Sequence, residues 1–238
     1  MGERESYAPG TFCWADLGTT DVEAATAFYG DVFGWEADGS RFRLAETDVG
    51  GVQAASEARW RSRLSVEDVD ALVERARELG GEVLTEPLDV ESAGRLAAVA
   101  DPTGAAVELW QPRELAGAGR VNDAGYMCWN ELASPDPGRA REFYATLLGW
   151  EIEPEETGYG VIRREGAVNG GIRPQQDGEP AHWLVYFTVD SCDDAVAAVR
   201  AGGGSVIAGP MDTPMGRVAA VRDPQGAPFA VFEGDVDP

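Results

Sequence analysis

Hydrophobic and polar positions follow nearly the same order in two stretches of equal length, residues 12–35 and 127–150. Each stretch starts with a short aromatic segment of alternating character, which is typical of a β-strand. An aspartate, Asp21 or Asp136, then precedes apolar residues spaced to form one buried face of a helix. A glycine followed by a tryptophan ends both stretches, and glycine suits the left-handed position after a helix. The pattern therefore predicts a strand and a capped helix in each half of the chain.

The same pattern starts again later in each half. In the first half it predicts a strand at 61–66 and a helix at 69–79, which a Gly-Gly pair ends. In the second half it predicts helices at 137–148 and 193–201. Three short strands follow each helix, so the chain predicts a β-α-β-β-β module four times over.

Further matches extend the repeat over most of the chain. Residues 101–105 (Asp-Pro-Thr-Gly-Ala) correspond to residues 223–227 (Asp-Pro-Gln-Gly-Ala), and Trp60 corresponds to Trp183. The stretch between the halves is rich in Ala, Gly and polar residues, which is typical of a linker. The predicted organisation is a first domain at 8–113, a linker at 114–123 and a second domain at 124–235.

The composition is that of an ordinary globular protein, with 44% hydrophobic and 26% charged residues among 238. The formal net charge of −23 argues against nucleic acid or an anionic membrane as a partner, because both need basic patches. This charge indicates either simple solubility or a preference for neutral and cationic ligands. Three cysteines without a CxxC pair predict neither a disulfide framework nor a zinc site. The first residues lack the apolar stretch of a signal peptide, so we expect a cytoplasmic protein.

These motifs resemble the vicinal oxygen chelate superfamily, which holds glyoxalase, bleomycin-resistance and extradiol-dioxygenase proteins. Within it, the chain is similar to tandem-domain actinobacterial proteins of the glyoxalase-like or "hydroxylase" type. The resemblance implies an α+β fold with two glyoxalase-like domains in tandem, each made of two βαβββ modules that curl around a concave pocket. Because one chain carries both halves, a monomer is sufficient, and a homodimer is compatible with the sequence.

Metal-dependent members of this superfamily hold a divalent ion with His, Glu or Gln side chains from the first, fourth, fifth and eighth strands of a unit. The first position, seven residues before the helix-opening aspartate, falls on Trp14 and Trp129. Tryptophan offers only an N–H donor and cannot bind a metal. The fifth-strand position falls on Arg61 and Leu184, which are not metal ligands either.

The eighth-strand position gives Glu108 in the first half and Ala230 in the second. His182, the single histidine, lies two residues before the fifth-strand position, and the fourth-strand position stays open near 52–55 or 172–175. We therefore predict no metal and no cofactor. The alternative is a divalent metal at Glu108.

Alternation along the strands predicts which side chains share each concave face. It places Phe12 on this face together with the tryptophan at position 14, and it turns Cys13 toward the helix. The first pocket is predicted to be charged and to hold Asp16, Arg61, Arg63 and Glu108 around Trp14 and Trp110. The second is predicted to be largely apolar and to be lined by Met127, Trp129, Leu184 and Phe232, with Glu131 and Tyr186 as its main polar groups.

A carboxylate in such a pocket tends toward a raised pKa because it is desolvated, and it then suits general base or acid chemistry. We predict Glu131 or Asp16 as the base, with Tyr186 or an arginine polarising a carbonyl group. Two alternatives stay open. In the first, the four charged residues of the first pocket form a satisfied ion-pair network. In the second, Trp14 and Trp129 fill the pockets as ordinary core residues.

Three functions follow from these observations. The first is a metal-independent protein that binds a small aromatic or polyketide-like metabolite or drug, for sequestration or for tailoring of lyase or hydroxylase type. The second is a metal-dependent enzyme of glyoxalase or dioxygenase type that uses Glu108. The third is a non-catalytic interaction or stress protein with filled pockets. No phosphate-binding loop, dinucleotide fingerprint or nucleophile elbow supports another chemistry.

Overall fold

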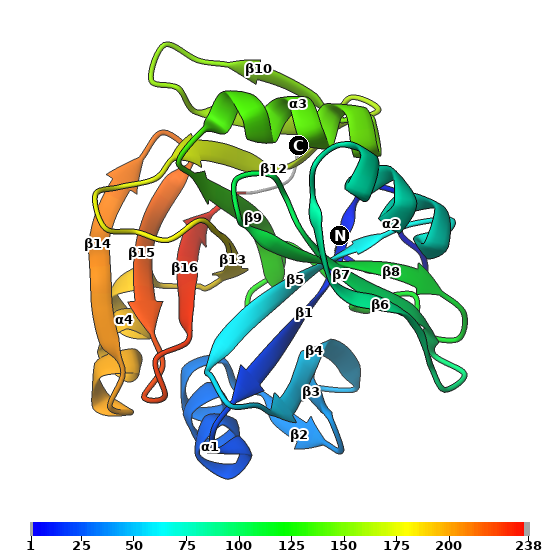
Figure 1. Cartoon of the computed structure of the whole chain (residues 1–238). Helices are drawn as coiled ribbons and strands as arrows, with labels where there is room; N and C mark the ends of the chain where they lie inside the picture. The colour runs from blue at the N-terminus through cyan, green and yellow to red at the C-terminus, as the bar shows by residue number, and fades with distance from the viewer. Residues whose placement is uncertain (1, 236–238) are drawn as a thin grey trace.

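The computed structural model of the chain describes residues 2–235 (Figure 1). Strand β1 (Phe12–Thr19) is buried throughout and leads into helix α1 (Val22–Phe33). The helix begins where the Asp21 carboxylate accepts a hydrogen bond from a backbone N–H of the first turn. It ends at Gly34, whose φ of 74° is the left-handed conformation that glycine adopts without strain. Helix α3 (Pro137–Leu148) starts and ends in the same way, as the sequence predicts.

Two mixed eight-stranded sheets form, with the strand orders β2-β3-β4-β1-β5-β8-β7-β6 and β10-β11-β12-β9-β13-β16-β15-β14. The remaining elements of the first domain are β2 (Glu36–Asp38), β3 (Arg41–Leu44), β4 (Thr47–Ala54), β5 (Arg59–Ser65), α2 (Val69–Glu78), β6 (Glu82–Val90), β7 (Gly94–Ala100) and β8 (Ala106–Pro112). Those of the second are β9 (Met127–Ser134), β10 (Glu151–Pro154), β11 (Gly160–Arg164), β12 (Ala167–Pro174), β13 (His182–Thr188), α4 (Cys192–Ala201), β14 (Ser205–Thr213), β15 (Gly216–Arg222) and β16 (Pro228–Gly234). The predicted α+β fold with four βαβββ modules is confirmed.

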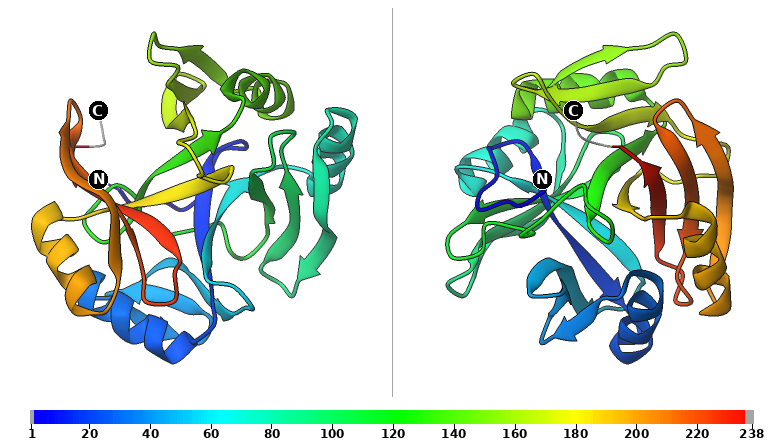
Figure 2. Two further views of the ribbon diagram at one scale, coloured as in Figure 1. Left: turned by 60° about the vertical axis from the view of Figure 1, so that its left-hand side comes forward. Right: turned by 180° about the vertical axis from the view of Figure 1, so that it is seen from behind.

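The helices cover one face of each sheet, and we call the opposite face the inner face. Helix α1 packs beside α4 of the other domain, and α2 packs beside α3 (Figures 1 and 2). The main hydrophobic core therefore contains side chains from both domains. No helix within residues 2–235 is long and apolar enough to cross a membrane.

Matching tryptophans connect the two domains. Trp35, which follows α1, donates its indole N–H to the carbonyl of Gly125 over 2.8 Å. Trp150, which follows α3, donates to the carbonyl of Gly10 over 2.7 Å. Each bond joins one domain to the segment that leads into the first strand of the other. The repeated Gly-Trp motif thus serves the packing of the domains against each other.

One expected orientation is wrong in both domains. In the pairing of β1 with β5, Phe12 lies opposite Leu64 and Trp14 lies opposite Arg63, so Cys13 is the extra residue of a β-bulge. The bulge turns Phe12 into the inter-domain core, where its ring centroid lies 5.0 Å from that of Trp183. Cys13 instead packs with Trp14, on the side away from the helix.

The second domain repeats this bulge at Cys128. Met127, which we expected on the inner face, is consequently part of the inter-domain core. Its sulfur accepts a hydrogen bond from the Asn130 side-chain amide over 3.4 Å. A single inserted residue changes the face on which every preceding side chain lies, and no alternation pattern reveals it.

Candidate functional site

The inner face of the first domain holds a buried ion-pair network around Arg63. Its guanidinium contacts the Asp16 carboxylate through Nη2 and the Glu108 carboxylate through Nε, the latter over 2.6 Å. Arg61 lies 3.2 Å from the other oxygen of Glu108, and Arg63 stacks 5.2 Å above the ring of Trp110. Burial raises the pKa of Glu108, and the positive charge of Arg63 opposes that rise. The charged residues predicted for this face do come together: Arg63 pairs with both carboxylates, while Nε and Nη2 of Arg61 are buried without a hydrogen-bond partner among the described residues.

The linker closes this inner face. The indole N–H of Trp110 donates to the carbonyl of Leu115 over 2.8 Å, and the N–H of Ala118 donates to the carbonyl of Cys13 over 2.8 Å. Trp14 and Trp110 are only 3% and 1% exposed as a result. Asp16, a predicted base, is held by Arg63 and by the Trp14 indole and lies under this cover. We therefore look for ligand chemistry in the second domain.

The inner face of the second domain is centred on Glu131. Arg173 of β12 donates to its carboxylate over 2.7 Å. Burial raises the pKa of Tyr186 well above its usual value, and the charge and hydrogen bonding of Glu131 raise it further. Burial also raises the pKa of Tyr159, and the charge of the Glu131 carboxylate is the second largest cause of that rise. Both phenols therefore remain protonated hydrogen-bond donors at neutral pH.

Strand register fixes the surroundings of these groups. Tyr186 on β13 lies between Trp129 on β9 and Ala230 on β16, and Leu184 lies opposite Glu131. Phe232, two residues after Ala230 on β16, lies opposite Thr188 of β13. Leu184 and Phe232 are buried, whereas Trp129, Glu131 and Tyr186 are half-buried. Five of the predicted residues thus share one patch that is less enclosed than its counterpart in the first domain.

Glycines at matching places provide the room for these polar groups. A methyl group at Gly51 on β4 would collide with the Asp16 carboxylate, and one at Gly171 on β12 would collide with the Tyr159 hydroxyl. Because glycine has no side chain, a polar group can lie directly against the backbone at both places. This group is a carboxylate in the first domain and a phenol in the second. Tyr159 lies between β10 and β11, where strand alternation gives no signal of a site residue.

The segment between β12 and β13 is tied to the site by Arg173. Its guanidinium donates to both oxygens of Glu179, over 2.7 and 2.6 Å, and these bonds lower the pKa of Glu179. His182, which we did not expect at a site, lies at the end of the segment and contacts the Pro180 carbonyl over 2.9 Å. The corresponding segment of the first domain, 55–58, is shorter than 175–181. Neither Arg173 nor Glu179 was predicted from the sequence. The one signal for Arg173 is its position two residues after the Gly170-Gly171 pair.

The residues at the metal positions of the superfamily do not fit a divalent ion. In the first domain a tryptophan and Arg61 stand at two of these positions, and Glu108 is bound by two arginines. In the second domain the positions hold Trp129, Leu184 and Ala230, and none of these side chains can ligate a metal. Across residues 2–235, no three His, Cys, Asp or Glu side chains gather in a way that could hold an ion.

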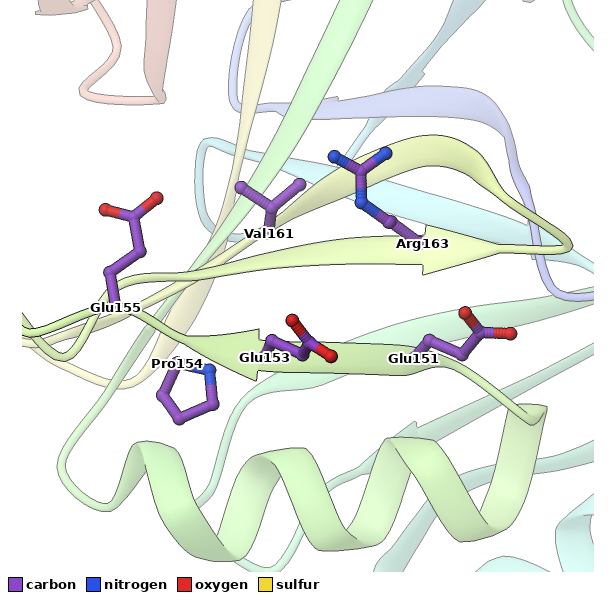
Figure 3. A pocket seen from close by; sticks show the side chains of 6 residues that line it. All are labelled: Glu151, Glu153, Pro154, Glu155, Val161 and Arg163. Atoms are coloured by element: carbon purple, nitrogen blue, oxygen red, sulfur yellow. The ribbon is translucent and has the colours of Figure 1, made fainter.

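Two cavities formed by the described residues lack both Glu131 and Tyr186. A hollow of about 350 Å³ is lined by Glu151, Glu153, Pro154, Glu155, Val161 and Arg163 (Figure 3). It lies on the outer hairpin of β10 and β11, and neither Glu131 nor Tyr186 lines it. A larger groove of about 520 Å³ lies beside Trp129 and Met127, which are the two predicted ligand residues that line it.

Comparison with known proteins defines the class. The model of the glyoxalase-like domain family matches residues 13–110 and again residues 129–232. The chain therefore belongs to the glyoxalase-like domain family, in tandem form, within the vicinal oxygen chelate superfamily.

Two relatives match over nearly the whole chain. CFP32 of Mycobacterium tuberculosis, whose name describes it as a glyoxylase, is 39% identical over 98% of both chains. The anthracycline biosynthesis protein DnrV of Streptomyces peucetius is 34% identical over 95% of this chain and 94% of its own.

Solved structures support the fold at lower identity. The Mn(II)-bound glyoxalase from Novosphingobium aromaticivorans aligns with a TM-score of 0.69 at 21% identity, covering 97% of this chain and 85% of that one. A variant of homoprotocatechuate 2,3-dioxygenase from Brevibacterium fuscum aligns with a TM-score of 0.71 at 20% identity, covering 99% and 76%. At these identities the likeness concerns the fold alone.

Proposed function

We propose that the protein binds a small aromatic or polyketide-like metabolite at the inner face of the second domain, without a metal, for tailoring or sequestration of that metabolite. One observation carries the proposal. Glu131, paired with Arg173, is a half-buried carboxylate with two phenols and an indole around it, whereas its counterpart Asp16 is buried against Arg63 and covered by the linker. A mostly apolar patch with a few convergent polar groups is the usual form of a small-molecule site. The similarity to an anthracycline biosynthesis protein supports an aromatic polyketide as the ligand.

The residues of this patch suit proton transfer. The rings of Trp129 and Phe232 offer apolar surface to a planar ligand. Glu131, held in place by Arg173, accepts a proton from an acidic C–H or O–H of the ligand. Tyr186 keeps its own proton because its pKa is raised, and on ligand binding its hydroxyl turns from Glu131 to donate a hydrogen bond to the ligand oxygen on which negative charge develops. The proton then returns from Glu131 to another atom of the ligand, so no electrons are exchanged with a cofactor.

A fluorescence titration with a soluble anthracycline tests the proposal. Glu131→Gln removes the charge and Tyr186→Phe removes the hydroxyl, and we expect each variant to weaken binding about tenfold or more, since a hydrogen bond to a charged group is lost or left unpaired. Glu108→Gln is the matched change on the closed inner face of the first domain, and we expect it to leave the affinity unchanged. Circular dichroism checks that all three variants are folded. Equal weakening by Glu108→Gln and Glu131→Gln would contradict the assignment to the second domain.

A further inference from the structure

The groove beside Trp129 lies where the N-terminal segment crosses the second domain. We call it the N-terminal groove, and its volume is about 520 Å³, the size of a small-molecule site. It is lined by Arg4, Ser6, Tyr7, Ala8, Thr11 and Phe12, by Val121 and Asn122 of the linker, by residues 127–130 of β9, and by Arg163, Gly166, Ala167, Val168 and Asn169 around the β11–β12 turn.

The charge of this groove is opposite to that of the whole protein. The chain carries 42 acidic residues and a net charge of −23, yet no carboxylate lines the groove. Two arginines, Arg4 and Arg163, do line it, and within residues 2–235 neither forms an ion pair. Arg163 is paired in register with Glu151, but its guanidinium points away from β10 and its glutamates (Figure 3). Arg163 also borders the acidic hollow of Glu151, Glu153 and Glu155, so it lies between that hollow and the groove, which it lines together with Arg4.

The walls of the groove are aromatic and held in place. Tyr7 donates its hydroxyl proton to the carbonyl of Ala118 over 2.6 Å. The side chain of Asn169 accepts from the N–H of Phe12 over 3.2 Å and donates to the carbonyl of Gly10 over 2.9 Å. These bonds fix the N-terminal segment against β12 and leave Tyr7 and Trp129 along the groove, while the ring of Phe12 packs in the inter-domain core. A ligand would therefore meet a site that is already formed.

The first domain shows how the equivalent place is closed. There the linker packs on the bulge residue Cys13 through Ala118, and Gly119 donates its N–H to the carbonyl of Asp48 over 3.0 Å. In the second domain the corresponding residues, Cys128 and Val168, line the open groove instead. The two halves of the duplicated structure thus differ at this place, which the linker covers in the first half and which lines the groove in the second.

We propose that the N-terminal groove binds a small aromatic carboxylate, with its ring against Trp129 and its carboxylate at Arg4 and Arg163. Arginine suits this role because its planar fork matches a carboxylate. The site adjoins the inner face of the second domain, with which it shares Trp129, but the inner face carries Glu131 and Glu179 against the single charge of Arg173 and so disfavours an anion. The two sites therefore favour ligands of different charge.

Calorimetric titration of the full chain at low salt with 2-naphthoate tests this proposal, with 2-naphthamide as the neutral probe of the same shape. We expect naphthoate to bind about tenfold more tightly than naphthamide, because only naphthoate can form charge-assisted hydrogen bonds. The double change Arg4→Gln with Arg163→Gln removes that advantage. The matched double change Arg139→Gln with Arg200→Gln, at exposed arginines on α3 and α4 that form no ion pair with any residue from 2 to 235, leaves it in place.

Two further variants separate the groove from the inner face. Ala167→Trp at the exposed β11–β12 turn fills the groove, and we expect it to abolish naphthoate binding. Glu131→Gln leaves naphthoate binding unchanged, even if it weakens binding of the anthracycline. The proposal is overturned if naphthoate fails to bind at about 1 mM, if naphthamide binds equally well, or if neither groove variant lowers the naphthoate affinity.

Discussion

At the scale of single residues, Arg63 is the centre of the buried charges on the inner face of the first domain. Its guanidinium supplies a fixed positive charge between Asp16 and Glu108, in the region where metal-dependent relatives of this superfamily place an ion. The Arg63 guanidinium is a cation that the protein itself supplies, so it needs no metal-ligating side chains around it. Tryptophan and arginine at the superfamily's metal positions are consistent with this arrangement. Of the alternatives that the sequence leaves open for the four charged residues, the ion-pair network is the one that the contacts support.

Removal of Arg63 tests this role. Arg63→Met leaves two buried carboxylates without their counter-ion, and we expect the free energy of unfolding to fall by about 3–5 kcal/mol at pH 7. Denaturant unfolding followed by circular dichroism measures the loss. The triple variant Asp16→Asn, Arg63→Met, Glu108→Gln removes Arg63 together with both of its carboxylate partners, keeps the charge of the less buried Arg61, and should recover most of the loss. A loss below about 1 kcal/mol, typical of a surface pair, would show that the network is not important for stability.

The pH dependence of the Arg63→Met variant has a defined sign. Burial already raises the pKa of Glu108, and without Arg63 nothing as strong opposes the rise. A carboxyl group whose pKa is higher in the folded state stabilises the fold below its unfolded pKa, and this stabilisation is lost as the pH rises through the folded pKa. The loss of unfolding free energy in Arg63→Met relative to wild type should therefore be smallest near pH 4 and should grow toward pH 7. Unfolding curves at several pH values measure it, and a deficit that shrinks with rising pH would contradict the assignment.

The candidate site could be predicted only in part from the sequence. Strand alternation gave Trp129, Glu131 and Tyr186, because they lie on central strands with one face in the main core and the other less enclosed. It could not give Arg173 and Tyr159, because the fourth strand of each module has no pattern strong enough to fix its register. Met127 was misplaced by the bulge at Cys128, which depends on strand pairing rather than on residue type.

At the scale of elements, the linker is the main difference between the two halves. Helix positions were predicted well because Asp21, Asp136 and the glycines after the helices specify the ends locally. The path of the linker could not be predicted, since small residues such as Gly117 fit many surfaces. In the structure Gly117 adopts a φ of 152°, and a side chain there would collide with the Cys13 carbonyl. Close packing over the first bulge thus requires glycine at this position.

The two bulge cysteines provide a test of this difference. Burial raises the pKa of both thiols to about 12, so both react slowly. Cys13 lies under the linker, whereas Cys128 lines the N-terminal groove. We expect iodoacetamide to label Cys128 about tenfold faster than Cys13 in the native protein, because Cys13 needs local opening first. Peptide mass spectrometry measures both rates in one sample.

A linker variant is the control for this experiment. Gly117→Ala pushes the linker away from the first bulge and should accelerate labelling of Cys13 without changing Cys128. Faster labelling of Cys13 than of Cys128 in the wild type would mean that the linker does not cover the first domain in solution.

At the scale of the whole molecule, the two domains form one structural unit. Their shared core, the reciprocal bonds of Trp35 and Trp150, and the 2.5 Å hydrogen bond from Ser62 to Asn130 cross the boundary between them. The pairing of α1 with α4 and of α2 with α3 brings together segments that are far apart in sequence. Duplication was evident in the sequence, but this arrangement of the halves was not, because core residues look alike whichever domain they contact.

Calorimetry of two tryptophan variants tests the shared core. We expect a single unfolding transition for the full chain, because neither domain can bury its core alone. Trp35→Phe should destabilise the protein by about 1–3 kcal/mol more than Trp150→Phe, since it leaves the Gly125 carbonyl unpaired. The Gly10 carbonyl keeps the hydrogen bond from Asn169 when Trp150 is changed. Two separate transitions, or equal losses in the two variants, would contradict this description.

The central claim is that the second domain binds an aromatic metabolite through Glu131 without a metal. The most direct measurement is a calorimetric titration of chelator-treated protein, verified as metal-free by elemental analysis, with a soluble anthracycline. We expect the metal-free protein to bind the anthracycline as tightly as untreated protein does, and we expect Glu131→Gln to weaken that binding in both. Binding that disappears on chelation and returns only with one equivalent of a divalent metal would contradict it.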